Sequence, residues 1–149
     1  MTTAQPVLTL QELWNASGEL RYELKFDEAS PSNNVLKNMH FHAYKHLRRM
    51  WRNRVLVALN GKRPQAPIER AFLVVTRECA GSGLDWDNVY GGLKPILDCL
   101  VSPSMRNPDG LGLIVDDALQ HMPFPPFVRQ LPAKPGKGRT TVQVYELTS

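Results

Sequence analysis

The chain has 149 residues, of which 42% are hydrophobic, and a formal net charge of +4. This length predicts a single domain, residues 1–149, with one buried core, and the composition excludes a disordered protein. No apolar run approaches the about 20 residues of a membrane span, the first residues lack the pattern of a signal peptide, and two cysteines are too few for a disulfide scaffold. We therefore expect a cytoplasmic protein with reduced thiols and no membrane contact.

Charge is unevenly distributed along the chain. Residues 35–70 contain nine lysines and arginines and a single glutamate, whereas residues 83–117 contain six aspartates against one lysine and one arginine. This order suits a protein that binds a polyanion with one part and cations with another. The alternative is that the basic segment is simply a solvated helix face.

The first half of the chain predicts a strand followed by a long helix. Apolar and polar side chains alternate over residues 19–27, which is typical of a strand with one buried face. Turn-forming residues follow, and residues 35–60 then predict one helix that ends before Gly61 and Pro64. One helix face carries an apolar stripe: Tyr44, Leu47, Trp51, Val55 and Ala58. Another carries what we call the basic stripe: His42, Lys45, Arg49 and Arg52.

The second half predicts strands at residues 68–77, 111–117 and 139–147, and a helix at residues 94–101. The strand at 111–117 is expected to be buried and to end on two adjacent acids. Residues 123–138 are rich in proline and predict a surface loop or arm. The expected fold is a compact α+β single domain in the order β-α-β-α-β-β, with a mixed sheet and a long basic helix.

Two acidic motifs are candidates for a metal site. The side chains of Asp85 and Asp87 would lie on one face of an extended segment, so that both reach one point. Asp116 and Asp117 follow an apolar run, and at most one of these neighbours is expected to share the site directly. Mg²⁺ binds through one or two carboxylates and leaves its other positions to water and phosphate. Acidic turns without any metal are the competing interpretation of both motifs.

Two further pairs have helical spacing. Lys94 and Asp98 are four residues apart, which fits either an ordinary surface pair or a lysine directed at a phosphate beside the metal. His42 and His46 have the spacing of a metal-binding pair, but no glutamate follows the first histidine and the basic neighbours would repel a cation.

Taken in order, these motifs resemble the RusA family of Holliday-junction resolvases, small endodeoxyribonucleases of phages and prophages. The matching pieces are a turn at Pro31-Ser32-Asn33-Asn34, the basic helix, Asp85-x-Asp87-Asn88, Lys94 with Asp98, and the acidic pair Asp116-Asp117. The family's short form has two residues between the Asp-Asn and the lysine, whereas five, Val89 to Leu93, stand here. We interpret the difference as a three-residue insertion before the helix.

The resemblance implies a homodimer that cuts opposing strands of a four-way DNA junction with Mg²⁺, for which Mn²⁺ can substitute. Its host is then a bacterial or phage-infected cell, where the protein acts at the nucleoid. The implied catalytic residues are Asp85, Asp87, Asp117 and Lys94, and the implied metal ligands are Asp85, Asp87, Asp117 and the supporting Asp116. The DNA-binding residues are then Asn33, Asn34, His42, Lys45, Arg49 and Arg52. Two other functions stay open: a non-catalytic DNA- or RNA-binding module, and a metal-dependent nuclease for other branched DNA.

Overall fold

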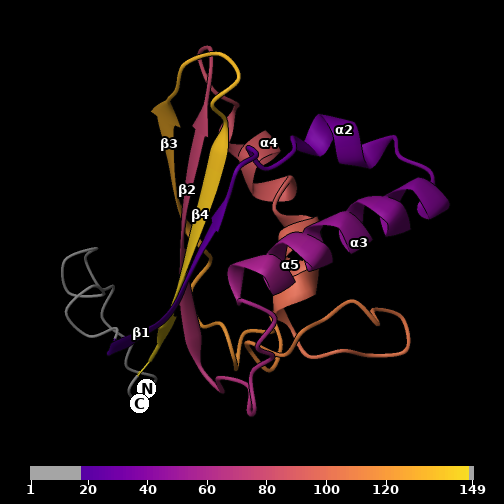
Figure 1. Cartoon of the computed structure of the whole chain (residues 1–149), viewed down its shortest axis with the longest axis vertical. Helices are drawn as coiled ribbons and strands as arrows, with labels where there is room; N and C mark the ends of the chain where they lie inside the picture. Colours follow the sequence, from indigo (N-terminus) through magenta and orange to yellow (C-terminus); the bar gives the residue numbers. More distant parts are fainter. Residues whose placement is uncertain (1–17, 148–149) are drawn as a thin grey trace, which may run out of the picture.

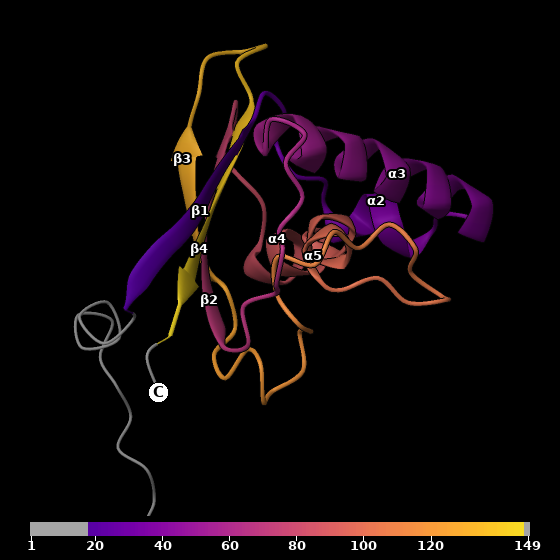
Figure 2. The ribbon, with the colours of Figure 1, turned by 60° about the horizontal axis from the view of Figure 1, so that its bottom comes forward.

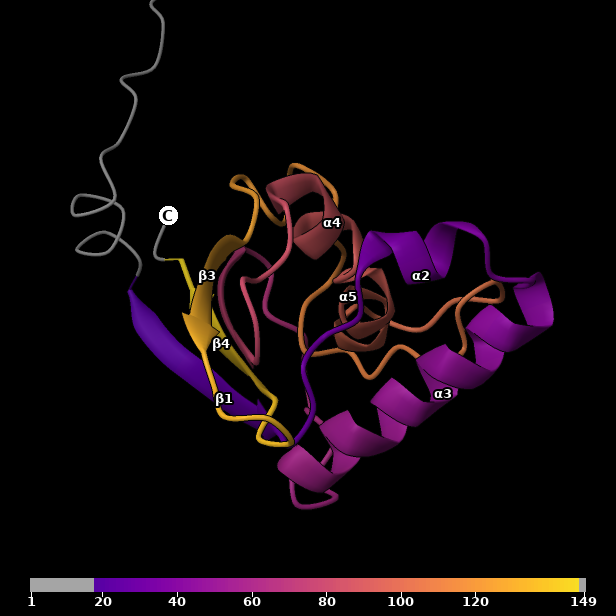
Figure 3. The same cartoon turned by 90° about the horizontal axis from the view of Figure 1, so that it is seen from above.

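A computed structural model describes residues 18–147, which form a sheet covered on one face by helices (Figure 1, Figure 3). The strands are β1 (Glu19–Phe26), β2 (Ala71–Cys79), β3 (Phe127–Pro132) and β4 (Arg139–Glu146). Their order in the sheet is β1-β4-β2-β3, with β4 antiparallel to both of its neighbours and β3 parallel to β2. The expected α+β fold with a mixed sheet is therefore confirmed. No helix within residues 18–147 is long and apolar enough to cross a membrane.

The helices described within residues 18–147 lie on the same side of the sheet (Figure 2). They are α2 (Asn33–Lys37), α3 (Phe41–Ala58), α4 (Trp86–Gly91) and α5 (Lys94–Leu100). The helices cover the sheet because α3 presents Trp51 and Val55 to the strands, where both side chains are almost fully buried. The Trp51 ring meets Phe26 of β1 edge-on, with 5.4 Å between the ring centres. The apolar stripe thus packs on the core, as its spacing predicts.

The long helix expected over residues 35–60 is wrong in one respect, because it is two helices. Ser32 caps α2 by accepting a hydrogen bond from the backbone N–H of Val35. The chain then leaves helical geometry, and His40 takes an extended backbone conformation with φ −65° and ψ 149°. Its Nδ1 accepts a hydrogen bond from the N–H of His42, which caps α3. A side chain that satisfies this free N–H allows a new helix to begin at Phe41.

The strand expected at residues 111–117 is also wrong. Ile114 alone pairs there, as a single parallel bridge with Ile68. The N–H groups of Leu111, Leu113 and Ile114 instead donate to the carbonyls of Cys99 and Leu100 at the end of α5. These carbonyls have no partner inside the helix, so the segment satisfies the helix end rather than joining the sheet.

The loop expected over the proline-rich residues 123–138 is confirmed at its two ends, but the prediction is wrong for residues 127–132. Residues 127–132 form β3, the edge strand beside β2. Proline is tolerated because Pro132 ends this edge strand, where a missing N–H costs no interior hydrogen bond. The helix expected at residues 94–101 is confirmed as α5, with Pro95 in its first turn.

Candidate nucleic-acid interface and acidic pocket

An acidic pocket of about 570 Å³ lies between the end of α5 and the segment that follows Val115. Its lining includes Asp98 of α5 together with Asp116 and Asp117. The backbone N–H of Asp117 donates to Asp116 Oδ1 at 2.9 Å, which holds the two residues in one turn. Three carboxylates from two distant stretches of the sequence therefore face one hollow.

The pKa of the Asp117 carboxyl is raised above its usual value. Partial burial is the largest cause, followed by the hydrogen bond and the negative charge of Asp116, with a smaller effect from the charge of Asp98. Each of these causes disfavours an uncompensated negative charge on Asp117. A proton or a cation would relieve the repulsion, and Mg²⁺ needs only one or two carboxylates beside water and phosphate. Asp116 and Asp117 offer two carboxylates of the kind that such an ion binds.

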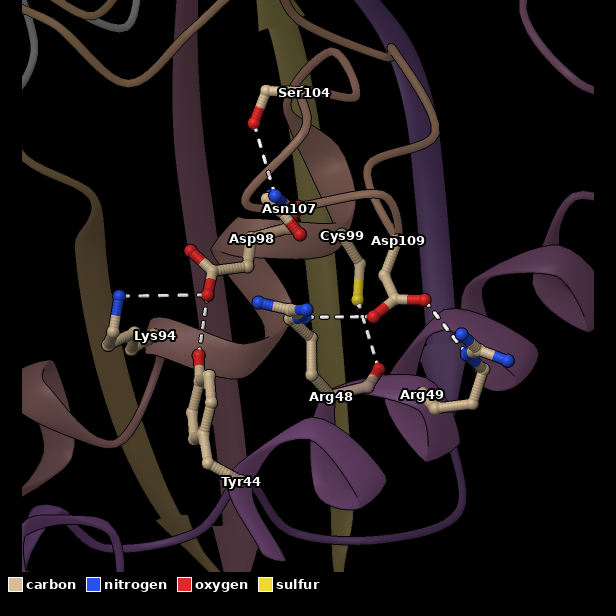
Figure 4. A network of polar contacts seen from close by, with 9 residues as sticks. All are labelled: Tyr44, Arg48, Arg49, Lys94, Asp98, Cys99, Ser104, Asn107 and Asp109. Atoms are coloured by element: carbon tan, nitrogen blue, oxygen red, sulfur yellow. Dashed lines mark hydrogen bonds and ion pairs between the residues drawn. The ribbon is translucent and has the colours of Figure 1, made fainter. Parts of the chain in front are cut away.

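Asp98 also joins α5 to α3 through Tyr44, and it pairs with Lys94 of its own helix (Figure 4). The Tyr44 hydroxyl donates to Asp98 Oδ2 at 2.5 Å, and Lys94 Nζ lies 3.6 Å from the same oxygen. Burial raises the pKa of Tyr44, and the hydrogen bond to Asp98 raises it further, so the hydroxyl stays protonated and remains a donor. Lys94 therefore lies beside a carboxylate that α3 holds in place. Sequence analysis placed Tyr44 in the apolar stripe only and missed this contact.

A buried carboxylate, that of Asp109, fixes the loop of residues 101–111 to α3. Its two oxygens accept hydrogen bonds from Arg48 Nε at 2.8 Å and from Arg49 Nε at 2.9 Å (Figure 4). Burial alone would raise the pKa of Asp109, but the two guanidinium groups outweigh it and the pKa lies below its usual value. Sequence analysis singled out neither Asp109 nor Arg48, because an ion pair between residues about 60 apart in the chain leaves no local pattern in the sequence.

A basic groove of about 580 Å³ lies between the start of α3 and the tip of the same loop. Its lining includes three residues of the basic stripe, His42, Lys45 and Arg49, and adds Arg106 from the loop. Arg52, the fourth member of the stripe, does not line this groove. His46 lies in the groove too, so the His42–His46 pair is surrounded by cationic side chains that disfavour a metal.

The loop of residues 101–111 separates the basic groove from the acidic pocket. Ser102, Ser104 and Asn107 line the acidic side, while Arg106 and Asp109 line the basic side. The amide of Asn107 also donates to the backbone carbonyl of Asp98 at 2.7 Å. A polyanion lying in the groove would therefore be separated from the carboxylates by the width of a single loop.

His121 is a further member of the acidic pocket that sequence analysis did not single out. Its Nδ1 lies 2.6 Å from the backbone carbonyl oxygen of Glu69. Because a carbonyl can only accept, Nδ1 carries the proton and donates. Nε2 is then left as the acceptor for the Gln120 amide, 3.0 Å away.

Asp85 and Asp87 are not in an extended segment, which corrects the argument for their convergence. Asp85 precedes α4 and Asp87 lies in its first turn, where residues two apart do not face the same way. Both residues are exposed, neither lines the acidic pocket, and neither carboxylate has a hydrogen bond or ion pair within residues 18–147. Across residues 18–147, no group of three or more His, Cys, Asp or Glu side chains is close enough to hold a metal ion. The structure thus does not bring Asp85 and Asp87 together with Asp117.

Two glycines, Gly91 and Gly92, explain how the end of α4 packs. A Cβ on Gly92 would lie 1.8 Å from the carbonyl oxygen of Pro31, and one on Gly91 would lie 2.6 Å from Asn33 Cγ. Only glycine permits this approach, so the turn before α2 rests against the end of α4. Asn33 also shares a small pocket with Lys94, whereas the neighbouring Asn34 is exposed and lines neither the basic groove nor the acidic pocket.

A scan of the chain against known protein families finds no matching family, and no curated protein matches it.

Proposed function

We propose that this protein is a Mg²⁺-dependent endonuclease of branched DNA, with the four-way junction as the substrate that the RusA resemblance implies. The observation that carries the proposal is the shared wall between the basic groove and the acidic pocket. A DNA backbone held on one side of the loop of residues 101–111 would present a neighbouring phosphate to the carboxylates on the other. Cleavage requires such a juxtaposition of phosphate binding and clustered acids.

The basic groove supplies affinity in this proposal. Lys45 and Arg49 carry positive charge on exposed side chains along one face of α3, at the spacing of one helical turn. Contacts of this kind with phosphates position a duplex without reading its sequence. The protein would therefore bind DNA of many sequences, with an affinity that falls as salt is added.

The acidic pocket supplies the chemistry. Asp116 and Asp117 would hold Mg²⁺, which when bound acidifies a water molecule and polarises the scissile phosphate. Lys94, whose side chain is largely exposed, would place its ammonium beside the developing negative charge. Asp98 and Tyr44 would orient that ammonium through the contacts described above. Their part is positioning, since neither would touch the reacting atoms.

For Asp85 and Asp87, the RusA resemblance and the observed positions of the side chains lead to different expectations. The resemblance makes them essential, whereas in this structure they lie apart from Asp117. Asp117→Asn should abolish cleavage with DNA binding retained, because the phosphate contacts lie on α3. If Asp87→Asn does the same, α4 must move toward the pocket in the active complex. If Asp87→Asn cleaves normally, the acidic pocket alone carries the reaction.

The test is incubation with end-labelled four-way junctions, three-way junctions, flaps and matched duplexes, each with Mg²⁺, with Mn²⁺ and with chelator. We expect paired nicks in the four-way junction only when a metal is present. Two matched nicks require two sites, so the protein should act as a homodimer. Light scattering that shows a particle of 16.8 kDa, alone and on DNA, would contradict junction resolution. Cleavage of flaps alone would give a nuclease of other branched DNA.

A second candidate, a non-catalytic DNA- or RNA-binding module, is favoured by a specific observation. Within residues 18–147, no three or more His, Cys, Asp or Glu side chains are close enough together to hold a metal ion. Such a module needs the basic groove only, and its acids would be structural. Binding that persists in chelator, with no cut in any branched DNA in Mg²⁺ or Mn²⁺, would establish the module instead.

A further inference from the structure

Two exposed apolar side chains border the basic groove on opposite sides. Phe41, at the first position of α3, is 62% exposed, and Met105, in the loop of residues 101–111, is fully exposed. Both line the groove together with Lys45, Arg49 and Arg106. A phosphate gains nothing from contacts with apolar side chains. Phe41 and Met105 therefore match a ligand that has a flat or apolar part beside its charge.

The tip that carries Met105 is held by several hydrogen bonds. Ser104 and Asn107 exchange backbone hydrogen bonds of 3.0 and 3.2 Å, so Met105 and Arg106 form a two-residue turn between them. The Asn107 amide donates to the carbonyl of Asp98 in α5, and Asp109 anchors the next residues to α3. The exposure of Met105 is therefore built into an anchored turn.

The charge of the groove selects an anion. Four of its side chains carry a positive charge, and Asp109 supplies a single carboxylate. Asp109 binds the Nε of Arg49, which leaves the terminal amino groups of that guanidinium for a ligand. The Lys45 ammonium lies 4.4 Å from the centre of the Phe41 ring, so positive charge and aromatic surface are adjacent. A nucleotide combines the two matching features, a phosphate and a flat base.

We propose that the groove binds an unpaired nucleotide of a DNA strand, with its phosphate on Lys45 and Arg49 and its base against Phe41 and Met105. The groove volume of about 580 Å³ lies within the range of about 300–1,000 Å³ that small-ligand sites have. A base that remains paired and stacked in a duplex cannot offer its face to these side chains, whereas one freed at a branch can. This inference rests on the proposed function and adds to it the feature of branched DNA that the protein recognises.

The experiment compares a fully paired duplex with the same duplex carrying a short bulge of unpaired thymines. Binding is followed by fluorescence anisotropy in chelator, so that cleavage does not enter. We expect the wild-type protein to bind the bulged duplex more tightly. Met105→Ala and Phe41→Ala should each reduce that preference about fivefold or more, the scale of losing one base-stacking contact, because the bulged duplex loses more affinity than the paired duplex.

Val57→Ala is the matched control, because Val57 is an exposed apolar residue of α3 that does not line the groove. It should leave the preference intact. A wild-type protein that binds both duplexes equally overturns the inference and leaves DNA binding standing. Equal losses for both duplexes in the Met105 or Phe41 variants also overturn it. A wild-type protein that binds no DNA contradicts the proposed function itself.

Discussion

Replacing Asp109 with asparagine tests the anchor of the loop that separates the two pockets. Asp109 is 3% exposed, and its partner Arg48 is 6% exposed. The substitution keeps the shape of the side chain but removes its charge, which leaves the Arg48 guanidinium buried without a counter-ion. Breaking a buried ion pair from one side costs about 3–5 kcal/mol.

For a chain of this size, each kcal/mol shifts Tm by about 2–4 °C. Asp109→Asn should therefore lower Tm by about 6–20 °C when thermal unfolding is followed by circular dichroism. Asp27→Asn is the control, since Asp27 is an exposed aspartate outside both pockets and should change Tm very little. Adding Arg48→Met to the Asp109 variant removes the unpaired charge and should restore part of the loss.

The pH dependence gives an independent check of the same ion pair. Because the pKa of Asp109 is lower in the folded protein than in the unfolded chain, its contribution is complete above the unfolded value of about 4. The contribution is lost as the pH falls through the lower, folded value. The difference in stability between the wild type and Asp109→Asn should thus be constant near neutral pH and shrink below about pH 4. A Tm loss below about 2 °C, or a difference that persists in acid, would refute the reasoning.

Lys94→Ala should slow cleavage about a hundredfold or more, the scale of losing one transition-state donor. Its Tm should change little, because the lysine side of the pair with Asp98 is largely exposed. Cleavage at a near-native rate would show that Lys94 is not part of the site. Asp116→Asn should lower the pKa of Asp117, since the substitution removes a repelling neighbour. An NMR titration of the Asp117 carboxyl carbon that gives the same pKa in the wild type and the variant would contradict this coupling. Gly92→Ala should destabilise the fold by about 3 kcal/mol in urea denaturation, because the added Cβ cannot fit 1.8 Å from a backbone oxygen; wild-type stability would show that the turn before α2 gives way easily.

Local pattern in the sequence determined those elements whose burial is periodic. The alternation over residues 19–27 gives β1, and its inward residues Leu24 and Phe26 are buried. The three- and four-residue spacing of Trp51 and Val55 gives the core face of α3. The alternating residues 139–147 give β4 for the same reason. In each case one side of the element faces the core and the other faces water, so the period of the apolar side chains predicts both the type of element and its buried face.

Elements that depend on distant partners could not be predicted in this way. Residues 111–115 are as apolar as a buried strand, but the free carbonyls at the end of α5 accept hydrogen bonds from the N–H groups of Leu111, Leu113 and Ile114. Residues 127–132 lie in a proline-rich stretch, yet they form a strand because the open edge of β2 supplies partners for their backbone hydrogen bonds. A backbone hydrogen bond goes to whichever group tertiary packing places nearby, and the local sequence carries no record of that choice.

The residues of the candidate site also fall into those that local sequence pattern predicts and those that only the tertiary structure reveals. Sequence alone singled out Lys94 with Asp98, the pair Asp116–Asp117, and the basic stripe, because charge and helical spacing are local properties. Only the tertiary structure decided that Asp109 joins the loop to α3, a contact between residues 60 apart in the chain. Only it decided that Asp87 begins a helix away from the acidic pocket. Carboxylates gather or separate according to how the intervening segments fold, and the sequence does not show that local contact of Gly92 with Pro31 by which the end of α4 packs.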